Sequence, residues 1–441
     1  MASSLDLVSE SRKYIQSLSI SPDEKKSRLE SLEQFFQMGL PTAKQEDWKY
    51  FSWNHFAQST YKPLAEGVTE LSKISMAAGA FGLTSKDAVY YNPNRFFVWR
   101  FLNQELQQSP PNENSNQFSL KIQDQRFDQS VEGLRNENSL GHLFRSLSTK
   151  AIVLEIPDNV SLSKPILIHE LFVNALATQQ HQEIQIIIGK NSKTQVIYFD
   201  QSQGSDFFRQ LRHKITVKEN ASVDLIRIQS LGKDATLIED IEVSTEKGAQ
   251  IRHLTVSLGA QNYRQNLVSN IQHSDVLVEA NAMAILSENQ LADIYTQLRH
   301  IEGGSLTKQT VKSLLGDQSK FNFNGMIVIG EGAKKANSEQ LNKNLLLSPR
   351  AEANSKPQLQ IYSDDVKATH GSTTGQLNKD EIFYFQSRAI SEEKAIQMLS
   401  VGHVSELIYQ IEFPVIQEFV LDQVSHKLNQ MKFEKTKVSK S

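Results

Sequence analysis

Ile184-Gln185-Ile186-Ile187-Ile188 belongs to a series of short β-rich runs that decide the fold of this 441-residue chain. The runs are rich in β-branched residues and are separated by small polar turns, a pattern typical of strands. Further runs of this kind lie at 195–199, 214–217, 223–228 and 251–256. From about Ala151 onward we therefore predict a body built from short strands.

Turn residues recur at a nearly constant step through this body. They are Asn191, Asn220, Gly248, Asp275, Gly303 and Gly332, and the successive steps are 29, 28, 27, 28 and 29 residues. Antiparallel hairpins would need tight Asn-Gly or Asp-Gly turns repeatedly, but the region holds one such dipeptide, Asn324-Gly325. A constant step without sequence identity between units indicates a solenoid, and we predict a parallel β-helix.

The segment before the strands reads as helical. Ser21-Pro22-Asp23-Glu24 supplies an N-cap, a proline at the first helical position and a capping-box glutamate. Apolar residues then recur at steps of three and four, and Gly39 with Pro41 predicts the end of the helix. The polar stretch from Asn103 to Gln117 has the composition of an exposed loop and predicts a boundary.

Helical periodicity returns after Leu377, in a stretch interrupted by Gly402 and Pro414. Two or three amphipathic helices are expected there. Their apolar residues are Ile396, Leu399, Leu407, Ile408, Ile411, Val415, Phe419, Val420, Val424 and Leu428. This apolar face is expected either to cap the end of the solenoid, which needs a cap in any case, or to dock a partner.

The predicted fold is mainly β, a parallel β-helix flanked by α-helical segments at both ends. Residues 1–117 form an N-terminal helical region and linker, residues 118–377 the β-helix, and residues 378–441 a C-terminal helical domain. A hydrophobic share of 39% and a mean hydropathy of -0.41 are low for a large compact globule. An extended solenoid, which exposes much surface per residue, tolerates such a composition.

The net charge and the sequence at the two ends of the chain restrict the classes of partner and the compartment that we expect. A net charge of -3 without a basic stripe argues against nucleic acid, and the basic tail at Lys432, Lys435, Lys437 and Lys440 reads as a solvated terminus. We find neither a signal-peptide pattern at the start of the chain nor an apolar run long enough to cross a bilayer. A cytoplasmic protein without membrane partners is therefore expected.

Few residues offer chemistry of their own. With no cysteine, the chain by itself can build neither a disulfide nor an all-cysteine metal site. It also has no phosphate loop, dinucleotide fingerprint, nucleophile elbow or zinc-protease motif, so no catalytic residues are assigned. Asp364 and Asp365 are adjacent carboxylates, but neighbours on a strand face opposite sides, which favours a turn at the edge of a coil.

His370 lies on an extended segment and is followed by Gly371. On a strand it shares a face with Val366 and Ala368, whereas Lys367 and Thr369 share the other face. A histidine beside a glycine is either a turn residue or a ligand. From the residues alone, both readings stay open.

A series of short sequence motifs, by its order and spacing along the chain, resembles the SufB/SufD family of iron-sulfur cluster assembly proteins. They are Gly39-Leu40-Pro41-Thr42, Glu46-Asp47-Trp48-Lys49-Tyr50, Phe321-Asn322-Phe323-Asn324-Gly325, Asn344-Leu345-Leu346-Leu347-Ser348, Lys356-Pro357-Gln358-Leu359, Ile361-Tyr362-Ser363-Asp364-Asp365-Val366-Lys367, His370-Gly371, Gly375-Gln376-Leu377, Phe383-Tyr384 and Ser387-Arg388. The resemblance spans nearly the whole chain and is most specific from 321 to 390.

The resemblance implies a right-handed parallel β-helix and two partners. One is a SufB-like subunit whose β-helix pairs with this one, and the other is a SufC-like ABC ATPase that docks on the C-terminal helices. ATP hydrolysis would then belong to the ATPase. The Glu46-Asp47-Trp48-Lys49-Tyr50 phrase and the lack of cysteine favour the SufD branch of the family over the SufB branch.

The resemblance also assigns a role to His370, because the family carries a matching histidine at the interface of the two solenoids. Many members have a cysteine two residues earlier, where this chain has Ala368. It implies that His370 contributes one nitrogen ligand to iron or to a nascent cluster, while thiolates come from the SufB-like partner. The chain would bind no cofactor stably by itself and would share the cluster only transiently.

Three functions are compatible with these features of the sequence. The leading one is a non-catalytic scaffold in a SufBCD-type complex that supports de novo cluster formation and assists iron acquisition. The second is a β-helix carbohydrate-active enzyme that uses Asp364 and another carboxylate. The third is a homodimeric structural solenoid, in which isolated chains pair through the edge that would otherwise meet the SufB-like subunit.

Overall fold

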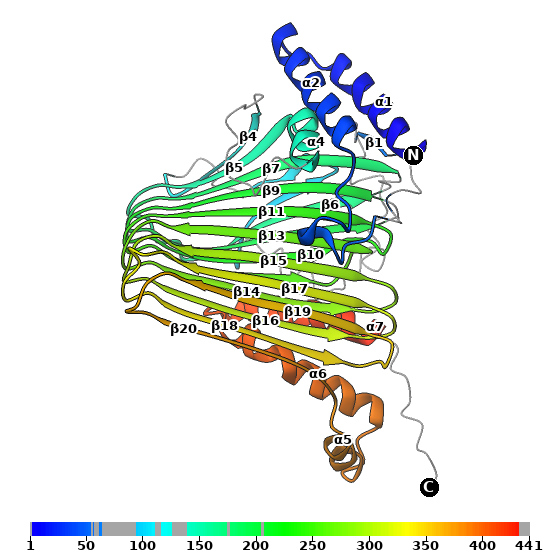
Figure 1. Cartoon of the computed structure of the whole chain (residues 1–441), viewed down its shortest axis with the longest axis vertical. Helices are drawn as coiled ribbons and strands as arrows, with labels where there is room; N and C mark the ends of the chain where they lie inside the picture. Colours follow the sequence, from blue (N-terminus) through cyan, green and yellow to red (C-terminus); the bar gives the residue numbers. More distant parts are fainter. Residues whose placement is uncertain are drawn as a thin grey trace.

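The computed structural model describes residues 2–53, 56, 61–63, 94–110, 116–125, 139–173, 177–203 and 207–431. Two long sheets face each other and run the length of the molecule, and from residue 150 onward the chain passes from one sheet to the other after each strand (Figure 1). The mainly β solenoid with helices near both ends is therefore confirmed. The basic tail from Lys432 to Lys440 lies outside the described residues.

Odd-numbered strands form most of one sheet, called sheet A here. It contains β1 (Lys62–Pro63), β4 (Ser119–Asp124), β5 (Lys150–Ile156), β7 (Thr178–Ile188), β9 (Phe207–Val217), β11 (Thr236–Thr245), β13 (Asn262–Ile271), β15 (Leu291–His300), β17 (Lys320–Ile329) and β19 (Glu352–Ile361).

Even-numbered strands form most of the other sheet, called sheet B. It contains β2 (Phe97–Leu102), β3 (Glu105–Gln108), β6 (Ile166–Val173), β8 (Lys193–Gln203), β10 (Ser222–Ser230), β12 (Gln250–Ser257), β14 (Leu277–Leu286), β16 (Leu306–Leu315), β18 (Asn337–Leu346) and β20 (Lys367–Gln376).

Strand pairing explains the constant step in the sequence. From β5 to β18, each strand pairs in parallel with the strand one coil later, for example Val223 with Ile251 and Asn262 with Leu291. One coil therefore takes 28 or 29 residues in these two pairs. Antiparallel pairs occur at the N-terminal end, where β2 meets β3 and β4 meets β5.

The predicted turn residues lie in a column along one corner of the solenoid. Asn191, Asn220, Gly248 and Asp275 have φ values of 55°, 56°, 70° and 62°, a left-handed conformation that Asn, Asp and Gly adopt most readily. In the next two coils the positive φ lies one and three residues further on, at Gly304 (72°) and Lys335 (59°), while the predicted Gly303 and Gly332 lie in the same turns.

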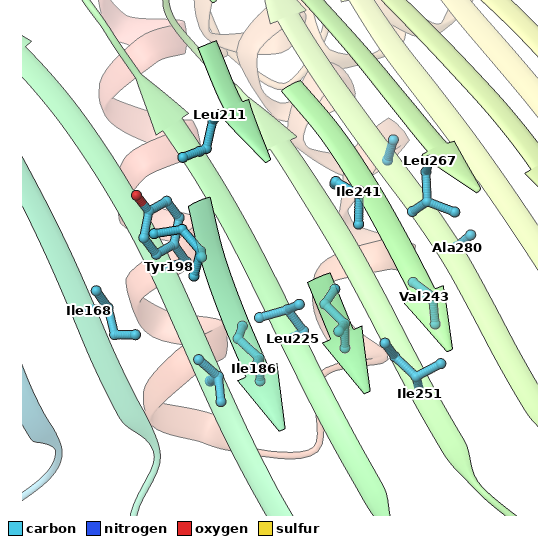
Figure 2. Close-up of a cluster of buried hydrophobic side chains, with 14 of the residues drawn as sticks. Ile168, Ile186, Tyr198, Leu211, Leu225, Ile241, Val243, Ile251, Leu267 and Ala280 are labelled. Carbon is cyan, nitrogen blue, oxygen red and sulfur yellow. The ribbon is translucent and has the colours of Figure 1, made fainter. Parts of the chain in front are cut away.

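Alternate side chains of both sheets fill the interior, or lumen, of the solenoid. Aliphatic residues from successive coils stack there, including Ile168, Ile186, Leu211, Leu225 and Ile241 (Figure 2). Each of these side chains is at most 3% exposed. Apolar burial along the whole rod thus holds each coil to its neighbours.

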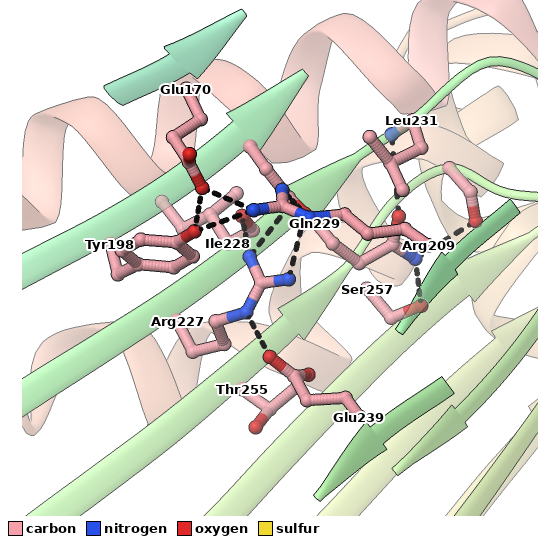
Figure 3. A network of polar contacts seen from close by, with 12 residues as sticks. Glu170, Tyr198, Arg209, Arg227, Ile228, Gln229, Leu231, Glu239, Thr255 and Ser257 are labelled. Atoms are coloured by element: carbon pink, nitrogen blue, oxygen red, sulfur yellow. Dashed lines mark hydrogen bonds and ion pairs between the residues drawn. The ribbon is translucent and has the colours of Figure 1, made fainter. Parts of the chain in front are cut away.

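A cluster of charged side chains interrupts this apolar lumen between β6 and β13 (Figure 3). Arg209 contacts Glu170 and, at 2.7 Å, Asp200, while Arg227 contacts Asp200 at 2.6 Å and Glu239 at 2.5 Å. All five side chains are at most 1% exposed. Buried ions are tolerated when they are paired and hydrogen-bonded in this way.

The N-terminal helices cover the outer face of sheet A and its first coils. They are α1 (Ala2–Ser17), α2 (Pro22–Met38), the 3-10 turn η1 (Glu46–Trp48) and α4 (Ser139–Leu147). The predicted N-cap and stop of α2 are confirmed, since the Ser21 hydroxyl accepts the Glu24 N–H at 3.2 Å and Gly39 ends the helix at φ 68°. The Glu24 carboxylate accepts Arg28 Nε at 3.0 Å, in place of the predicted capping-box bond. Buried Arg28 joins α2 to α4 by donating to the Ser148 carbonyl at 2.8 Å.

The interpretation of Asn103–Gln117 as a loop was wrong in part, because it contains β3, which folds back on β2. Asn103 and Gln104, with φ values of 46° and 74°, form the two-residue turn. Consecutive positive φ values suit the twist of a tight hairpin. β3 could not be recognised from its residues, since it is a polar edge strand that buries little apolar surface.

The C-terminal helices are α5 (Lys379–Gln386), α6 (Glu392–Tyr409) and α7 (Pro414–Gln430). Pro414 begins α7 as predicted, but Gly402 lies inside α6 and does not interrupt it. The apolar faces of α6 and α7 pack on the outer face of sheet B, against side chains such as Ile197, Ile228 and Met283. They lie along the flank of the rod and not over its end, so the expected end cap is corrected.

Candidate functional site at the C-terminal end of the solenoid

The last coil, β19 and β20, ends the two sheets. Each of these strands has one hydrogen-bonded sheet neighbour in the described chain, β17 for β19 and β18 for β20. Most residues of β20 are exposed, in contrast to the buried inner strands. Both free edges therefore carry backbone groups that can pair with another strand.

His370 lies on the lumen-facing side of β20. Ala368 and His370 pair in register with Ser338 and Gln340 of β18, whose side chains are 0% and 3% exposed in the lumen. The prediction that Ala368 and His370 share one face agrees with this register. His370 itself is exposed, because no later coil of the described chain covers it.

A row of hydrogen-bonded amides runs back from this end into the lumen. The Gln340 Nε2 group donates to Gln309 Oε1 at 2.8 Å, and Gln309 Nε2 donates to Thr296 Oγ1 at 2.8 Å. Gln309 and Gln340 are 1% and 3% exposed. Reasoning from the sequence missed this row because only the strand register brings its members together.

A second polar row lies beneath Ala368. Ser338 Oγ is 2.5 Å from Thr307 Oγ1, which is 3.0 Å from His300 Nε2. Burial lowers the pKa of His300 to about 4. His300 is therefore a neutral hydrogen-bonding group near neutral pH and is 1% exposed.

The free edge of sheet B presents a full set of backbone donors. The Lys367 N–H points to β18 and donates to the Ala336 carbonyl at 2.9 Å. Because successive N–H groups alternate sides along a strand, those of Ala368, His370 and Ser372 face the free edge.

The free edge of sheet A differs at its centre. The Glu352 N–H donates to the Ser319 carbonyl at 3.0 Å on the β17 side. By alternation, the backbone nitrogen of Pro357 faces the free edge, where proline's lack of an N–H breaks no ladder bond. At this end, the free edge of β20 therefore offers an unbroken series of backbone N–H donors for edge pairing, whereas the free edge of β19 does not.

The carboxylates singled out in the sequence do not form an acid/base pair. Asp364 and Asp365 lie in the exposed bend between β19 and β20, and the Asp365 carbonyl accepts the Lys335 N–H at 2.6 Å. The interpretation as a turn is confirmed. Among the described residues, no group of three or more His, Cys, Asp or Glu side chains is placed to hold a metal ion.

A second exposed surface lies on α5. Phe383 and Tyr384 are 70% and 54% exposed. Asp380 and Glu381 flank the aromatic residues at the start of α5. We call this the α5 patch, and it combines large apolar groups with negative charge in the manner of a docking surface.

A cavity of about 310 Å³ lies between η1 and the outer face of sheet A, and the sequence did not reveal it. Its lining includes Trp48, Asp240, Arg264 and Tyr295. Arg264 stacks over the Trp48 ring at 4.1 Å and forms an ion pair with Asp293. These contacts fix the Trp48 segment on sheet A.

A family model described as "SUF system FeS cluster assembly, SufBD core domain" matches residues 171–403. The chain belongs to the SufBD family. The match begins in β6, ends inside α6 and includes the exposed last coil with His370. The resemblance predicted from the sequence is thereby confirmed.

SufBD relatives agree with this assignment. An iron-sulfur cluster assembly SufBD family protein of Synechocystis is 30% identical over 281 residues, which cover 61% of this chain and 62% of the relative. The chain thus spans less than two thirds of that relative. The SufD proteins of Escherichia coli and Bacillus subtilis are 25% and 23% identical, covering 90% and 66% of this chain and 91% and 68% of those relatives. These matches support the SufD branch of the SufBD family.

Among the described helices, none is both long and apolar enough to cross a membrane.

Proposed function

We propose that this chain is a non-catalytic scaffold subunit of a SufBCD-type complex that supports de novo iron-sulfur cluster formation. The observation that carries the proposal is the last coil, where a histidine is exposed on the lumen-facing side of a strand with a free edge. Family membership supplies the chemical context. The cluster is the product of the complex, shared transiently between subunits, and this chain binds no cofactor stably by itself.

In this proposal the partner at the free edge is a SufB-like β-helix. Pairing of β20 with a strand of that partner would satisfy its unpaired N–H groups and bring His370 to the boundary between the two subunits. Since the chain has no cysteine, the thiolate ligands come from the partner. His370 then supplies one imidazole nitrogen to entering iron or to the nascent cluster.

The second partner is a SufC-like ABC ATPase, docked on the C-terminal helices. The α5 patch supports this role because Phe383 and Tyr384 remain exposed while α6 and α7 bury their apolar faces on the solenoid. Residues 378–441 would serve as the docking domain, with residues 118–377 as the β-helix and 1–117 as the N-terminal region. A cytoplasmic location accords with this role.

Affinity purification of the tagged chain from its own organism tests the scaffold. An ABC-type ATPase and a second β-helix subunit should be recovered with it, together with iron and labile sulfide. His370→Ala should leave both partners bound and lower the iron and sulfide content, because one ligand is lost. Thr369→Ala, on the opposite face of β20, is the matched control. Recovery of neither partner overturns the scaffold, and unchanged iron with His370→Ala overturns the site.

A second candidate function is a homodimeric solenoid. It rests on the same free edge, which can pair with β20 of a second copy when the SufB-like subunit is absent. The carbohydrate-active enzyme receives no such support, because Asp364 lies in an exposed bend. A purified chain that stays dimeric when the SufB-like subunit is added would favour the homodimer.

A further inference from the structure

We propose that Gln340 is a positioning residue for His370. Its side-chain oxygen accepts a hydrogen bond from one ring nitrogen of His370 and thereby leaves the other nitrogen to bind iron. The inference rests on the ligand role proposed above for His370. It concerns a buried amide that lies one coil below the exposed histidine.

The strand register brings the two side chains together. Gln340 of β18 pairs directly with His370 of β20, and both residues face the lumen. Paired residues of neighbouring strands are separated by about 5 Å along the rod, so their side chains stand next to each other. Gln340 is 3% exposed, whereas His370 above it is exposed.

A hydrogen bond to the preceding coil sets the orientation of the Gln340 amide. Its Nε2 group donates to Gln309 Oε1 at 2.8 Å, back toward β16. Gln309 is oriented in turn by its own Nε2 bond of 2.8 Å to Thr296 Oγ1. Because an amide is planar and its nitrogen and oxygen diverge, a nitrogen that points back toward β16 directs the oxygen toward the last coil.

The Gln340 oxygen lacks a partner among the described residues, although it is buried from solvent. An unsatisfied buried acceptor is costly, so native structures rarely keep one without a reason. The lumen is shaped to hold this amide, since a Cβ on Gly325 would lie 2.3 Å from Gln340 Nε2. Glycine in the middle of β17 thus makes room for the Gln340 side chain.

Asn342 shows the contrast on the same strand and the same face. Its Oδ1 atom accepts the Asn344 amide at 2.8 Å and the Ser355 hydroxyl at 2.8 Å. Its in-register neighbour in β20 is Ser372 and not a ligand candidate. The unpaired amide oxygen of this strand therefore lies under the histidine and not under the serine.

The chemistry fits an imidazole ligand. A histidine that binds a metal through one nitrogen almost always donates its other ring N–H to an acceptor, which fixes the tautomer and the ring orientation. An amide oxygen is such an acceptor. The Thr296–Gln309–Gln340 row would thus extend to His370 and hold its ring toward the subunit boundary.

The test uses the complete complex purified through the tagged chain, with iron and labile sulfide measured per complex. Gln340→Met keeps the side-chain volume but removes the oxygen, and it should lower retained iron about tenfold, the usual range for loss of such a partner being about 10–100-fold. Gln340→Glu retains an acceptor oxygen and should restore most of the iron. Asn342→Leu, the matched control, should retain the native content.

A second variant disturbs the orientation of the Gln340 side-chain oxygen without replacing Gln340. Gln309→Leu removes the acceptor that orients the amide, so a partial loss of iron is expected while both partners stay bound.

The outcomes separate this inference from the proposed function. Native iron content in both Gln340→Met and Gln309→Leu, with loss in His370→Ala, overturns the inference and leaves the ligand role standing. Equal losses in Gln340→Met and Gln340→Glu also overturn it, since a volume effect would then suffice. Native iron content in His370→Ala overturns the ligand role and this inference with it.

Discussion

The charged cluster in the lumen depends on Glu239. Its carboxylate lies 2.5 Å from Arg227 Nε, 2.8 Å from His213 Nε2 and 2.6 Å from the Tyr263 hydroxyl. Burial by itself would raise the pKa of Glu239, but the Arg227 charge and the two hydrogen bonds hold it well below its ordinary value. The carboxylate stays ionised inside the rod because every charge near it is paired.

His169 provides a pH-dependent test at the scale of one residue. Burial, and secondarily the charge of Arg100, lower the pKa of His169 to about 3, and its ring stacks on Phe199 at 4.8 Å. The unfolded chain takes up a proton near pH 6.5 while the native chain does not, so stability falls as pH decreases below 6.5. We therefore compare the drop in the free energy of unfolding between pH 6.5 and pH 4.5 in the two proteins. In His169→Phe this drop should be smaller than in the native chain by about 2 kcal/mol.

Urea unfolding monitored by far-UV circular dichroism at the two pH values measures this difference. Parallel losses of stability in the two proteins would contradict the burial of a neutral imidazole at this position.

At the scale of the element, one corner of the solenoid has a residue with positive φ in coil after coil, as at Asn191, Asn220 and Gly248. Gly248 has φ 70°, and a Cβ on it would lie 2.3 Å from Asn220 Oδ1 of the preceding coil. The Asn220 side chain can rotate away, but the backbone strain of a Cβ at this φ cannot be relieved. The corner residues therefore set the coil length by local geometry as well as by packing.

Gly248→Ala should lower the unfolding free energy by about 1–3 kcal/mol, because alanine is strained at positive φ. The matched control is Gly402→Ala in the middle of α6, where a Cβ would meet nothing within 4 Å. That change should stabilise the chain by about 0.5–1 kcal/mol, since alanine favours helix. Midpoints of thermal unfolding should move in opposite directions, and a shift of both in the same direction would count against the corner argument.

The whole molecule is a rod with a covered flank and an open end. Helices α6 and α7 cover the outer face of sheet B, while β19 and β20 keep free edges at the end of both sheets. Salt bridges such as Lys193 with Glu412 at 2.9 Å join the α6–α7 connection to the flank. The open end of the rod therefore carries strand edges that no described strand pairs with.

Edge pairing can be blocked without disturbing the fold. Ala368→Pro removes an N–H that faces the free edge of β20 and leaves the ladder to β18 intact, so the SufB-like subunit should be lost from the purified complex. Ala368→Val adds a similar side chain, keeps the N–H and should retain the subunit. Quantitative mass spectrometry of the recovered proteins measures both. Equal recovery with proline and valine would show that β20 is not the pairing strand.

Some of the site was predictable and some was not. The common face of Ala368 and His370 followed from strand alternation, a local property of the backbone. The position of Gln340 next to His370 could not be predicted, because the two residues are 30 positions apart. This step is longer than the average coil length predicted from the turn residues. Only the register, set by the lengths of the corners between the strands, identifies such a pair.

By itself the sequence determined the repeating coil, the turn residues at its corner, the N-cap of α2 and the lack of any thiolate ligand in this chain. These features depend on local backbone preferences, on a periodic pattern or on composition. The tertiary structure alone decided that α6 and α7 lie on the flank, that β3 folds back on β2, and that an amide row ends beneath His370. An apolar face or a buried amide does not encode its own partner, because any complementary surface at the right distance can satisfy it.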